Sequence, residues 1–479
     1  MLRWGILGAG KIAGRFADSL KHVPDSMLYA ISGRNMEKLE AFAEKHPCEK
    51  IYVGHENMLD DPDLDVIYLA LPHALHKEWA LKALEKGIPV LCEKPASLNA
   101  EEMREIAECA KQHNTLFMEA MKLRFVPAYR KLKEMLEEGV IGDIEDVSAS
   151  MCFPFPKEAF GMTYHTQAGK GSGALLDGGI YCAGIVEDWL KGTPVPCMTY
   201  ANYYGFDLYS EAYLKFDNGT ARIESGFDRA LPKDAVIKGT KGIVTVHDFH
   251  RPTRFVICTD EGETEYEFPY EHDDFYSEIA HFASLVQQGK TESDIMTYAS
   301  MIREAEILDT IASQFTCYDE ADCQVLEAQE KEFAVEQFTS QDALALGNTI
   351  VSLLKDYDRG VAVRIDRCAD DVAVFQYVSD DKKDANLRYA DGKKACVRDT
   401  GHSSAWVYVK NRMDGSYEDW KKDGVHVVSG GAFPLYGKEG ILAVIQVSGL
   451  HEGKDHELIV RALAKQQKKA YTHFIKAIG

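Results

Sequence analysis

The sequence predicts an α/β protein in three parts: a parallel-sheet domain, an α/β domain with an open, mainly antiparallel sheet, and an appended α/β domain. Up to about residue 125, short apolar stretches alternate with amphipathic helical stretches. These apolar stretches are continuous, which is typical of parallel strands buried on both faces. From Met198 to Phe268 strands follow one another in series, which is typical of an antiparallel sheet.

The elements of the first domain can be read in chain order. We expect strands at LRWGILGA, MLYAISGR, DVIYLALP, PVLCEKP and TLFMEAM. We expect helices at KIAGRFADSLKHV, MEKLEAFAEKH, HKEWALKALEKG and NAEEMREIAECAKQHN. Helices that return the chain between parallel strands cover both faces of the sheet.

Domain boundaries follow from the changes of pattern. A chain of 479 residues is too long for one hydrophobic core, and we expect domains at residues 1–122, 123–318 and 325–479. Residues 316–335 are charged and free of glycine, which predicts a helical or extended connector. The third domain is expected to contain strands at VAVRID, VAVFQYV, SAWVYVK and ILAVIQVSG, between helices at SQDALALGNTIVSLLKDY and DHELIVRALAKQQKKAYTHFIKAI.

Charge and cysteine usage exclude several classes of protein. The formal net charge of −22 argues against binding to nucleic acid or to an anionic membrane surface. No apolar run is long enough to span a bilayer, and the N-terminus does not have the pattern of an export signal. The 11 cysteines form no C-x-x-C pair, so we expect reduced thiols, no metal site and a cytoplasmic location.

The turn GAGKIAGR follows the first strand and opens the first helix. Gly8, Gly10 and Ala13 have the spacing of the dinucleotide-binding fingerprint of a Rossmann domain. Gly8 allows the tight turn, Gly10 lets the backbone approach a pyrophosphate, and the helix N-terminus faces the phosphates. Lys11 and Ile12 complete this candidate cofactor site, and the alternative is a glycine-rich turn without a ligand.

The end of the second strand, ISGRN, bears on the choice of cofactor. An NAD site would place Asp or Glu there to bind the ribose hydroxyls, and none is present. Ser32 and Arg34 stand there instead, and an arginine pairs well with the 2′-phosphate of NADP. We therefore expect NADP rather than NAD, although Arg34 as a solvated side chain remains the alternative.

Three motifs together resemble the Gfo/Idh/MocA oxidoreductase family over residues 1 to about 318. They are GILGAGKIAGRF, YLALPHALHKEWALKALEKGIPVLCEKPASLNAEE and GALLDGGIYC. The resemblance implies that Glu93 helps to hold the cofactor, that Lys94 reaches the reacting centre and that Pro95 fixes the turn, often through a cis bond. A lysine at the carboxyl edge of a parallel sheet also lies where such folds bind ligands. The alternative is a structural Lys–Glu pair.

The segment LLDGGIYC supplies the partners of Lys94. Asp177 and Tyr181 are four residues apart and share one face if the segment is helical. Tyr181 with Lys94 nearby is a candidate general acid and base, and Asp177 a group that orients the substrate. Much of the family has His at the position of Tyr181 and an acid where Gly184 stands, so the chain resembles the tyrosine-bearing branch. A packed tyrosine is the alternative.

The same resemblance suggests further contacts. Candidate cofactor contacts follow the third strand: Leu71, Pro72 and His76. Arg124 resembles a substrate-side position of the family. His165 and Lys170 are further candidate substrate contacts, from their place in a glycine-rich loop ahead of Asp177. For His76 and Arg124 the alternatives are a structural histidine and an exposed arginine.

The tail from about residue 325 to 470 resembles a small α/β family described as haem-degrading, whose members form large oligomers and in part bind haem. Four histidines are possible iron ligands: His402, His426, His456 and His473. No C-x-x-C-H haem attachment motif is present, and histidines with ordinary partners are the favoured interpretation.

Together these features predict an NAD(P)-dependent oxidoreductase that moves a hydride between nicotinamide and a secondary alcohol or carbonyl. The resemblance implies a sugar, polyol or diol as substrate and a homo-oligomer. Two alternatives stay open. One is a haem or small-ligand binding protein with an attached reductase. The other is a glycoside-processing enzyme that uses transient oxidation by a bound cofactor.

Overall fold

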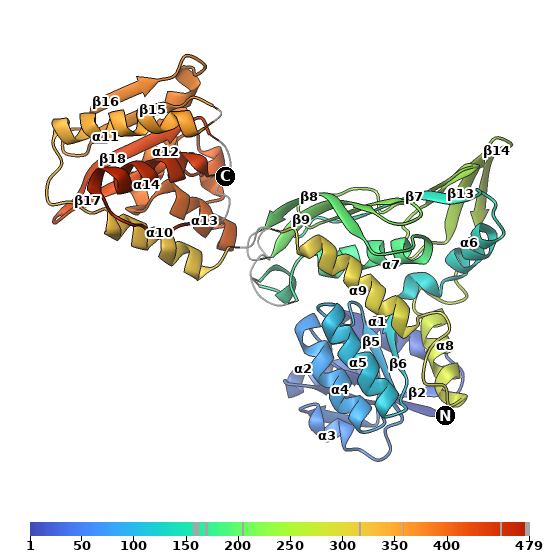
Figure 1. The fold of residues 1–479 in the computed structure, drawn as a ribbon. Helices are drawn as coiled ribbons and strands as arrows, with labels where there is room; N and C mark the ends of the chain where they lie inside the picture. Colours follow the sequence, from blue (N-terminus) through green and yellow to red (C-terminus); the bar gives the residue numbers. More distant parts are fainter. Residues whose placement is uncertain are drawn as a thin grey trace. The chain divides into compact units, whose positions relative to one another are not determined.

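The computed structural model describes residues 1–156, 162–167, 171–203, 206–315, 318–357, 359–450 and 453–474. The chain divides into two compact units (Figure 1). The first comprises Met1–Asn202 and Phe206–Phe315, and the second comprises residues 316–479 together with 203–205. Among the described residues, no helix is long and apolar enough to cross a membrane.

The N-terminal part of the first unit is a six-stranded parallel sheet with the order β3-β2-β1-β4-β5-β6. Its strands are β1 Leu2–Leu7, β2 Ser26–Gly33, β3 Lys50–Val53, β4 Val66–Leu69, β5 Val90–Glu93 and β6 Phe117–Ala120. Its helices are α1 Lys11–Leu20, α2 Met36–Lys45, α3 Glu56–Leu59, α4 His76–Glu85 and α5 Ala100–Gln112, and a 3-10 turn, η1, spans His73–Leu75. This is the strand order of a Rossmann fold, so the predicted fold class is confirmed.

Burial explains why these segments form the centre of a sheet. Every residue of β4, β5 and β6 is buried, as the continuous apolar stretches predicted. Helix α1 follows β1 after two glycines, and its buried residues, among them Ala13 and Phe16, pack onto the sheet. The strand order reverses between β1 and β4, where a crevice opens at the carboxyl edge.

The rest of the first unit is an eight-stranded sheet with the order β14-β13-β12-β11-β7-β10-β9-β8. Its strands are β7 Ile144–Cys152, β8 Val195–Tyr203, β9 Asp207–Lys215, β10 Thr220–Gly226, β11 Ala235–Gly239, β12 Gly242–Val246, β13 Arg254–Thr259 and β14 Gly262–Glu267. Among the strand pairs described for this sheet, only β7–β10 is parallel. An open, mainly antiparallel sheet was predicted here and is observed.

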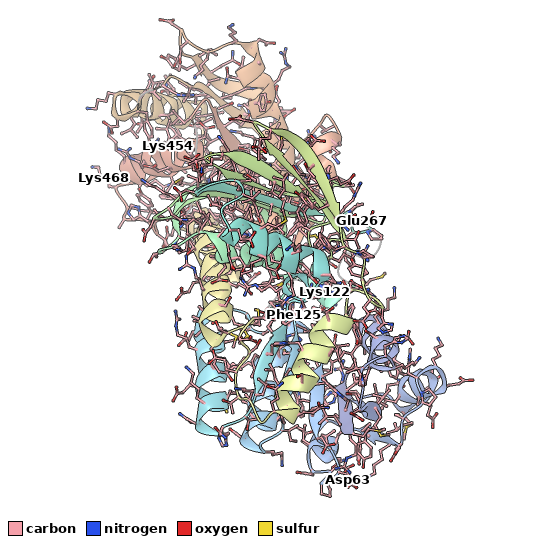
Figure 2. The ribbon with its side chains drawn as sticks, turned by 90° about the vertical axis from the view of Figure 1, so that its right-hand side faces the viewer. Asp63, Lys122, Phe125, Glu267, Lys454 and Lys468 are labelled. Carbon is pink, nitrogen blue, oxygen red and sulfur yellow. The ribbon has the colours of Figure 1, made fainter. Side chains whose placement is uncertain are left out.

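Helices join the two sheets of this unit. They are α6 Pro127–Glu137, α7 Ile180–Trp189, α8 Tyr276–Gln287 and α9 Tyr298–Ala312, with 3-10 turns η2 Lys122–Arg124 and η4 Tyr164–Thr166 and a π-helix, η5, at Leu175–Gly179. Helix α9 packs against both α5 and α7, and α7 packs on β7. Lys122 and Phe125, between the two sheets, mark the passage of the chain from one to the other (Figure 2).

The second unit is a four-stranded antiparallel sheet, order β16-β15-β18-β17, with its own hydrophobic core. Its strands are β15 Ala362–Arg367, β16 Val372–Val378, β17 Ala432–Gly437 and β18 Gly440–Ser448. Its helices are α10 Glu320–Glu332, α11 Ser340–Leu353, α12 Asp384–Thr400, α13 Ser404–Asp414 and α14 Lys454–Gln467, with 3-10 turns η6 Leu354–Asp356 and η7 Asp419–Lys422. The predicted connector is in large part helix α10, which packs on α13 and β17.

One predicted strand of the second unit is wrong. SAWVYVK lies in helix α13, because the Ser403 side chain accepts a hydrogen bond from the backbone N–H of Trp406 and caps the helix. Ala405 and Val409, four residues apart, are both buried in a small cluster with residues of α10. Helical spacing therefore outweighs the β-propensity of Val407 and Tyr408.

Candidate functional site

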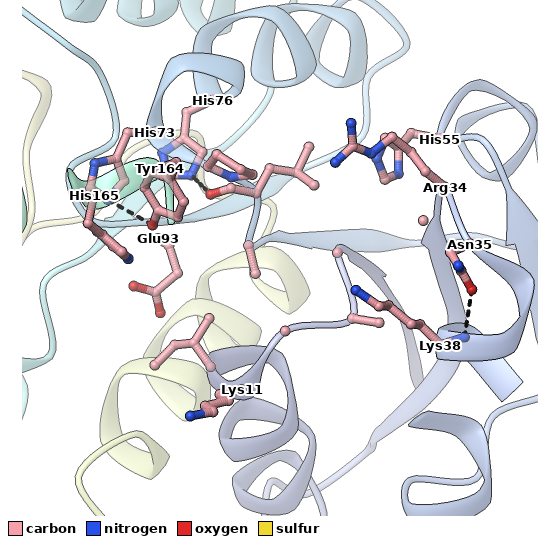
Figure 3. A pocket seen from close by; sticks show the side chains of 18 of the residues that line it. Lys11, Arg34, Asn35, Lys38, His55, His73, His76, Glu93, Tyr164 and His165 are labelled. Atoms are coloured by element: carbon pink, nitrogen blue, oxygen red, sulfur yellow. Dashed lines mark hydrogen bonds between the residues drawn. The ribbon is translucent and has the colours of Figure 1, made fainter. Parts of the chain in front are cut away.

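A pocket of about 570 Å³ opens at the carboxyl edge of the parallel sheet, in the crevice between β1 and β4 (Figure 3). Most of the predicted site residues line it: Gly8, Gly10, Lys11, Ile12, Arg34, Leu71, Pro72, His76, Glu93, Lys94, His165 and Asp177. Arg34, Asn35, Lys38 and His55 lie at one end, and His73, Tyr164, His165 and Glu93 at the other.

The glycine turn forms the middle of the pocket. Gly8 has a φ of +101°, and a Cβ there would lie 2.5 Å from the carbonyl oxygen of Ala70, so only glycine fits. A Cβ on Gly10 would meet nothing within 4 Å, so the backbone at Gly10 borders open space. Ala13 is fully buried and does not line the pocket, which fits a packing role beneath the turn.

The N-terminus of α1 faces this open space without a cap. The N-cap residue, Gly10, makes no side-chain cap hydrogen bond, no acidic residue lies in the first turn, and Lys11 is its first residue. Free N–H groups, the positive end of the helix dipole and a lysine favour an anion. The turn therefore fits the pyrophosphate of a dinucleotide.

Cations gather at the end of β2. Arg34 and Lys38 line the pocket there, and Lys11 lines it at the start of α1; within the described part of the chain none of the three has a carboxylate partner. Among the residues that the structure describes, the acids that line the pocket are Glu93 and Asp177. This end of the pocket therefore offers unpaired positive charge in a chain whose net charge is −22.

Ser32 was predicted as a cofactor contact, and the structure places it differently. Its side chain is buried beneath the pocket surface, with Oγ 2.8 Å from Nδ1 of His55. His55, which the sequence did not single out, is the residue that lines the pocket. Ser32 therefore acts beneath the pocket surface, where its hydroxyl contacts the ring of His55.

Lys94 and Asp177 form the centre of the other end. Lys94 Nζ lies 2.9 Å from Oδ1 and 2.8 Å from the backbone oxygen of Asp177, and both side chains are about 15% exposed. Burial alone would raise the pKa of Asp177, but its basic neighbours, Lys94 first, lower it to about 2. The peptide bond between Lys94 and Pro95 is cis. Beside them Glu93 accepts a hydrogen bond from the Tyr68 hydroxyl, and burial raises the pKa of Glu93.

Three aromatic or imidazole side chains complete this end: His73, Tyr164 and His165. His73 Nδ1 lies 2.9 Å from the carbonyl oxygen of Gly171, and its Nε2 lies 3.4 Å from the Tyr164 hydroxyl. Burial lowers the pKa of His73 to about 3 and also lowers the pKa of His165. Both imidazoles are therefore neutral at pH 7.

Asp207, at the start of β9, is hydrogen-bonded to the segment that contains Asp177. Its carboxylate accepts a hydrogen bond of 2.6 Å from the backbone N–H of Leu175, the first residue of the π-helix. Burial raises the pKa of Asp207 to about 7. The position of Asp177 therefore depends on a buried acid that is distant in sequence.

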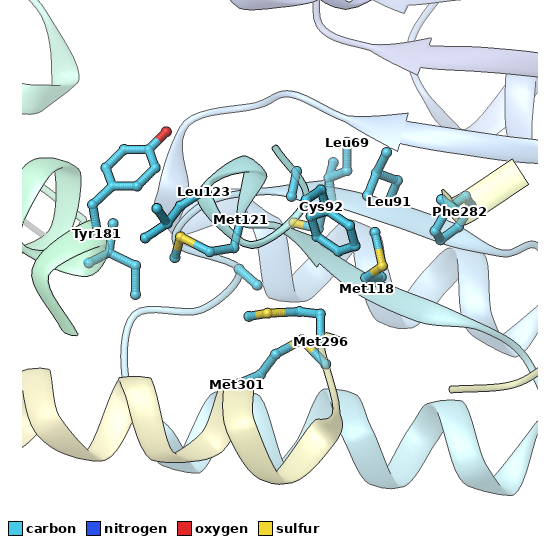
Figure 4. Packing of buried hydrophobic residues seen from close by; sticks show 14 of the residues in the cluster. Leu69, Leu91, Cys92, Met118, Met121, Leu123, Tyr181, Phe282, Met296 and Met301 are labelled. Atoms are coloured by element: carbon cyan, nitrogen blue, oxygen red, sulfur yellow. The ribbon is translucent and has the colours of Figure 1, made fainter. Parts of the chain in front are cut away.

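Tyr181 does not line the pocket, unlike Asp177. Lys94 Nζ lies 5.1 Å from the centre of its ring, and the ring lies at one end of the hydrophobic cluster near Leu123 (Figure 4). Burial raises the pKa of Tyr181 well above its usual value, and nearby carboxylates, Glu93 first, add to this effect. Asp177 lies in the π-helix Leu175–Gly179 and Tyr181 in the first turn of α7, and Lys94 contacts both side chains.

Arg124 was predicted as a substrate contact, and its geometry contradicts this. The side chain is 2% exposed and pairs with Glu187, Asp188 and Glu304. Another donor reaches Ser300, and Arg124 does not line the pocket. Three carboxylates from α7 and α9 hold the guanidinium inside the protein, so it joins helices instead of binding substrate.

Two predicted contacts remain, His76 and Lys170. His76 is fully buried, with its ring nitrogens 2.8 Å from the Pro95 oxygen and 2.7 Å from the Leu71 oxygen. It therefore ties the loop after β4 to the Lys94–Pro95 turn. Lys170 lies outside the described residues.

The histidines of the second unit have ordinary partners. His402 pairs with Glu330 at 2.9 Å, which raises the pKa of His402, and His426 lies between Asp399 and Asp423. His456 Nε2 lies 2.9 Å from the side-chain oxygen of Gln329, and the ring of His473 contacts that of Tyr471. His402 also borders a second pocket, of about 510 Å³, with Tyr436.

Comparison with known proteins agrees with this geometry. Residues 2–121 match the family model of an oxidoreductase family with an NAD-binding Rossmann fold, and residues 129–245 match its GFO/IDH/MocA C-terminal domain. Residues 338–464 match the model of a haem-degrading, HbpS-like protein.

Relatives cover the first unit. The chain is 31% identical over 325 residues to trans-1,2-dihydrobenzene-1,2-diol dehydrogenase of Xenopus tropicalis, covering 65% of this chain and 97% of that protein. It is 31% identical over 323 residues to scyllo-inositol 2-dehydrogenase (NADP(+)) of Bacillus subtilis, covering 66% and 97%. A 3-ketoreductase from Actinomadura kijaniata, solved with NADP and TDP-benzene, has a TM-score of 0.60 at 26% identity and covers 65% and 97%.

Proposed function

Because the chain belongs to the Gfo/Idh/MocA oxidoreductase family, we propose that it moves a hydride between NAD(P) and the carbon of a secondary alcohol or carbonyl. Similar proteins act on a dihydrodiol and an inositol, which supports a diol, polyol or sugar as substrate class. One observation carries this proposal: a single pocket joins the open glycine turn to the Lys94–Asp177 pair.

We propose NADP as the preferred cofactor. The unpaired Arg34 and Lys38 lie at the end of β2, where a 2′-phosphate would lie in a Rossmann fold. Asn35 and His55 add hydrogen-bonding groups beside them. An NAD site would need a carboxylate at this place, and the lining acids lie at the other end.

The reaction end of the pocket supports a division of roles. Bound NAD(P) supplies the hydride acceptor or donor. Lys94, fixed by two contacts to Asp177, points its ammonium at the substrate oxygen and stabilises negative charge there. Asp177 accepts hydrogen bonds from neighbouring hydroxyls of the substrate, and His165 accepts or donates them.

Tyr181 is the proposed group that exchanges the proton with the substrate oxygen. Its raised pKa keeps the phenol protonated, which suits a proton donor in the direction of reduction. The contact between Lys94 and the ring of Tyr181 is the geometric observation that supports this role.

We also propose a homo-oligomer inside the cell. All ten cysteines of the described residues are unpaired, which suits a reducing compartment. The HbpS-like unit has its own core and bears a separate pocket beside His402, so it has the features of an independent ligand-binding or assembly module.

The test uses the purified full chain and its Lys94→Met variant. We expect NADP reduction in the presence of diols, polyols or free sugars, and loss of turnover in Lys94→Met with NADPH affinity retained. Lys45→Met, an exposed lysine outside the pocket, is the control that keeps both. Cofactor binding with no turnover of any of these substrates would contradict the dehydrogenase and point to chemistry by transient oxidation.

A further inference from the structure

The pocket brings together two imidazoles and one carboxylate from distant parts of the chain. His73 lies in η1, His165 in η4 and Asp177 in the π-helix. One ligand atom of each lies within 4.8 Å of the other two. We propose that these three residues form a binding site for a divalent transition-metal ion of the zinc type.

The orientation of His73 supports this site. A backbone carbonyl only accepts hydrogen bonds, so Nδ1 of His73 carries the proton that it donates to Gly171, at 2.9 Å. The lone pair of a neutral ring is then on Nε2, whose other contact is the Tyr164 hydroxyl at 3.4 Å. Metal-binding histidines typically have their second ring nitrogen fixed by a carbonyl or a carboxylate in this way.

His165 and Asp177 are also oriented as ligands. Nδ1 of His165 is buried, has no hydrogen-bond partner among the described residues, and lies 3.7 Å from Oδ2 of Asp177. Lys94 Nζ donates a hydrogen bond of 2.9 Å to the other oxygen of this carboxylate, Oδ1. Oδ2 is therefore available to a second cation, while Lys94 fixes the plane of the carboxylate as an outer ligand would.

The ligand set selects the class of ion. Two imidazoles and one carboxylate suit Zn²⁺ and its neighbours, whereas Mg²⁺ and Ca²⁺ prefer oxygen ligands. Three protein ligands leave at least one coordination position, and all three residues line the pocket. Water or a substrate oxygen would complete the coordination there. The site shares Asp177 and His165 with the proposed substrate end of the pocket, but ion binding can be measured without cofactor or substrate, so it is tested separately from hydride transfer.

The sequence alone did not show this site. The three residues are separated by 92 and 12 positions, and no short metal-binding motif contains them. We therefore expected no metal site from the sequence, and the structure changes that expectation.

The experiment is a Co²⁺ titration of the full chain after treatment with EDTA, followed by competition with Zn²⁺. We expect one ion per chain with the strong visible absorption of four-coordinate Co²⁺, displaced by Zn²⁺. His73→Ala and His165→Ala should each weaken binding by at least about 100-fold, because loss of a ligand exceeds the effect of losing a group that orients it.

His55→Ala is the matched control, because it removes a histidine from the opposite end of the same pocket. It should keep the Co²⁺ spectrum, and thermal unfolding verifies that each variant folds. Unchanged binding in both His73→Ala and His165→Ala, or no stoichiometric binding by the wild type, would overturn the proposal. Either result would leave the NADPH titration and the turnover assay untouched.

Discussion

Replacing the two unpaired cations at the end of β2 gives the sharpest test of cofactor choice. Arg34→Ala and Lys38→Ala each remove one positive charge from the pocket. Neither side chain has a carboxylate partner among the described residues, so no buried acid is left behind when it is removed. The effect on binding therefore reports what the cation does for the ligand.

The magnitude follows from the charge of the 2′-phosphate. A hydrogen bond to a charged group contributes about 1.5–3 kcal/mol, and each 1.4 kcal/mol is a factor of ten in affinity. Each variant should therefore bind NADPH about 10- to 140-fold more weakly. NADH has a neutral hydroxyl at that position, for which the loss is about 0.5–1.5 kcal/mol, or roughly 2- to 12-fold. The double variant should lose less than the product, because Arg34 and Lys38 are neighbours.

The assay is a fluorescence titration of NADPH and NADH at two salt concentrations. The NADPH affinity of the wild type should fall with salt more steeply than that of either variant, since screening acts on the removed charge. Lys45→Ala, at the exposed end of α2, removes the same charge outside the pocket and should change neither affinity. Equal losses for NADPH and NADH, or a wild type that prefers NADH, would refute the assignment of these residues to the 2′-phosphate.

Three further predictions follow from single contacts. Tyr181→Phe should lower kcat by about 100-fold or more without changing NADPH affinity, because general acid catalysis is lost; turnover within a few-fold of the wild type would assign the proton to Lys94. Arg124→Met should lower the free energy of unfolding in urea by about 3–5 kcal/mol, because buried carboxylates lose their cation; a raised KM at unchanged stability would return Arg124 to the substrate. The pKa of Asp207 is about 7 in the folded protein and 3.8 in the unfolded chain. The folded state therefore holds the proton more tightly, and the free energy of unfolding falls as pH rises from 3.8 to 7. From pH 5 to pH 8 the free energy of unfolding of the wild type should fall by about 2–3 kcal/mol more than that of Asp207→Asn. Thermal unfolding of both proteins at the two pH values measures this difference.

The sequence predicted those parts of the fold and site that depend on local signals. The positive φ and the close backbone contact at position 8 admit only glycine, so this feature of the fold is visible in the sequence. Buried parallel strands leave continuous apolar runs, which located the sheet and the pocket at its carboxyl edge. Lys94 was found in the same way, as a charged residue directly after a buried strand.

Other parts depend on contacts between distant residues, which a single sequence does not record. The predicted strand end was correct, but nothing in ISGRN says that Ser32 faces inward and holds His55. The sequence around Arg124 does not distinguish an exposed cation from a buried one, and the three acids that surround it are far from it in the sequence. His73 was adjacent to a predicted contact, in LPHALH, and Tyr164 precedes His165, so nearness to predicted site residues was the one signal for both.

The charges of the pocket also constrain the substrate. At the end near β2 the cations are unpaired, which suits an anionic cofactor. At the other end the ammonium of Lys94 is already paired with Asp177, the imidazoles of His73 and His165 are neutral at pH 7, and Glu93 is an acid whose pKa is raised. With no metal ion bound, a sugar phosphate would find no free cation among these residues and would meet a carboxylate. A neutral diol or polyol would find hydrogen-bond donors and acceptors with no net charge, so the electrostatics of this end favour an uncharged substrate.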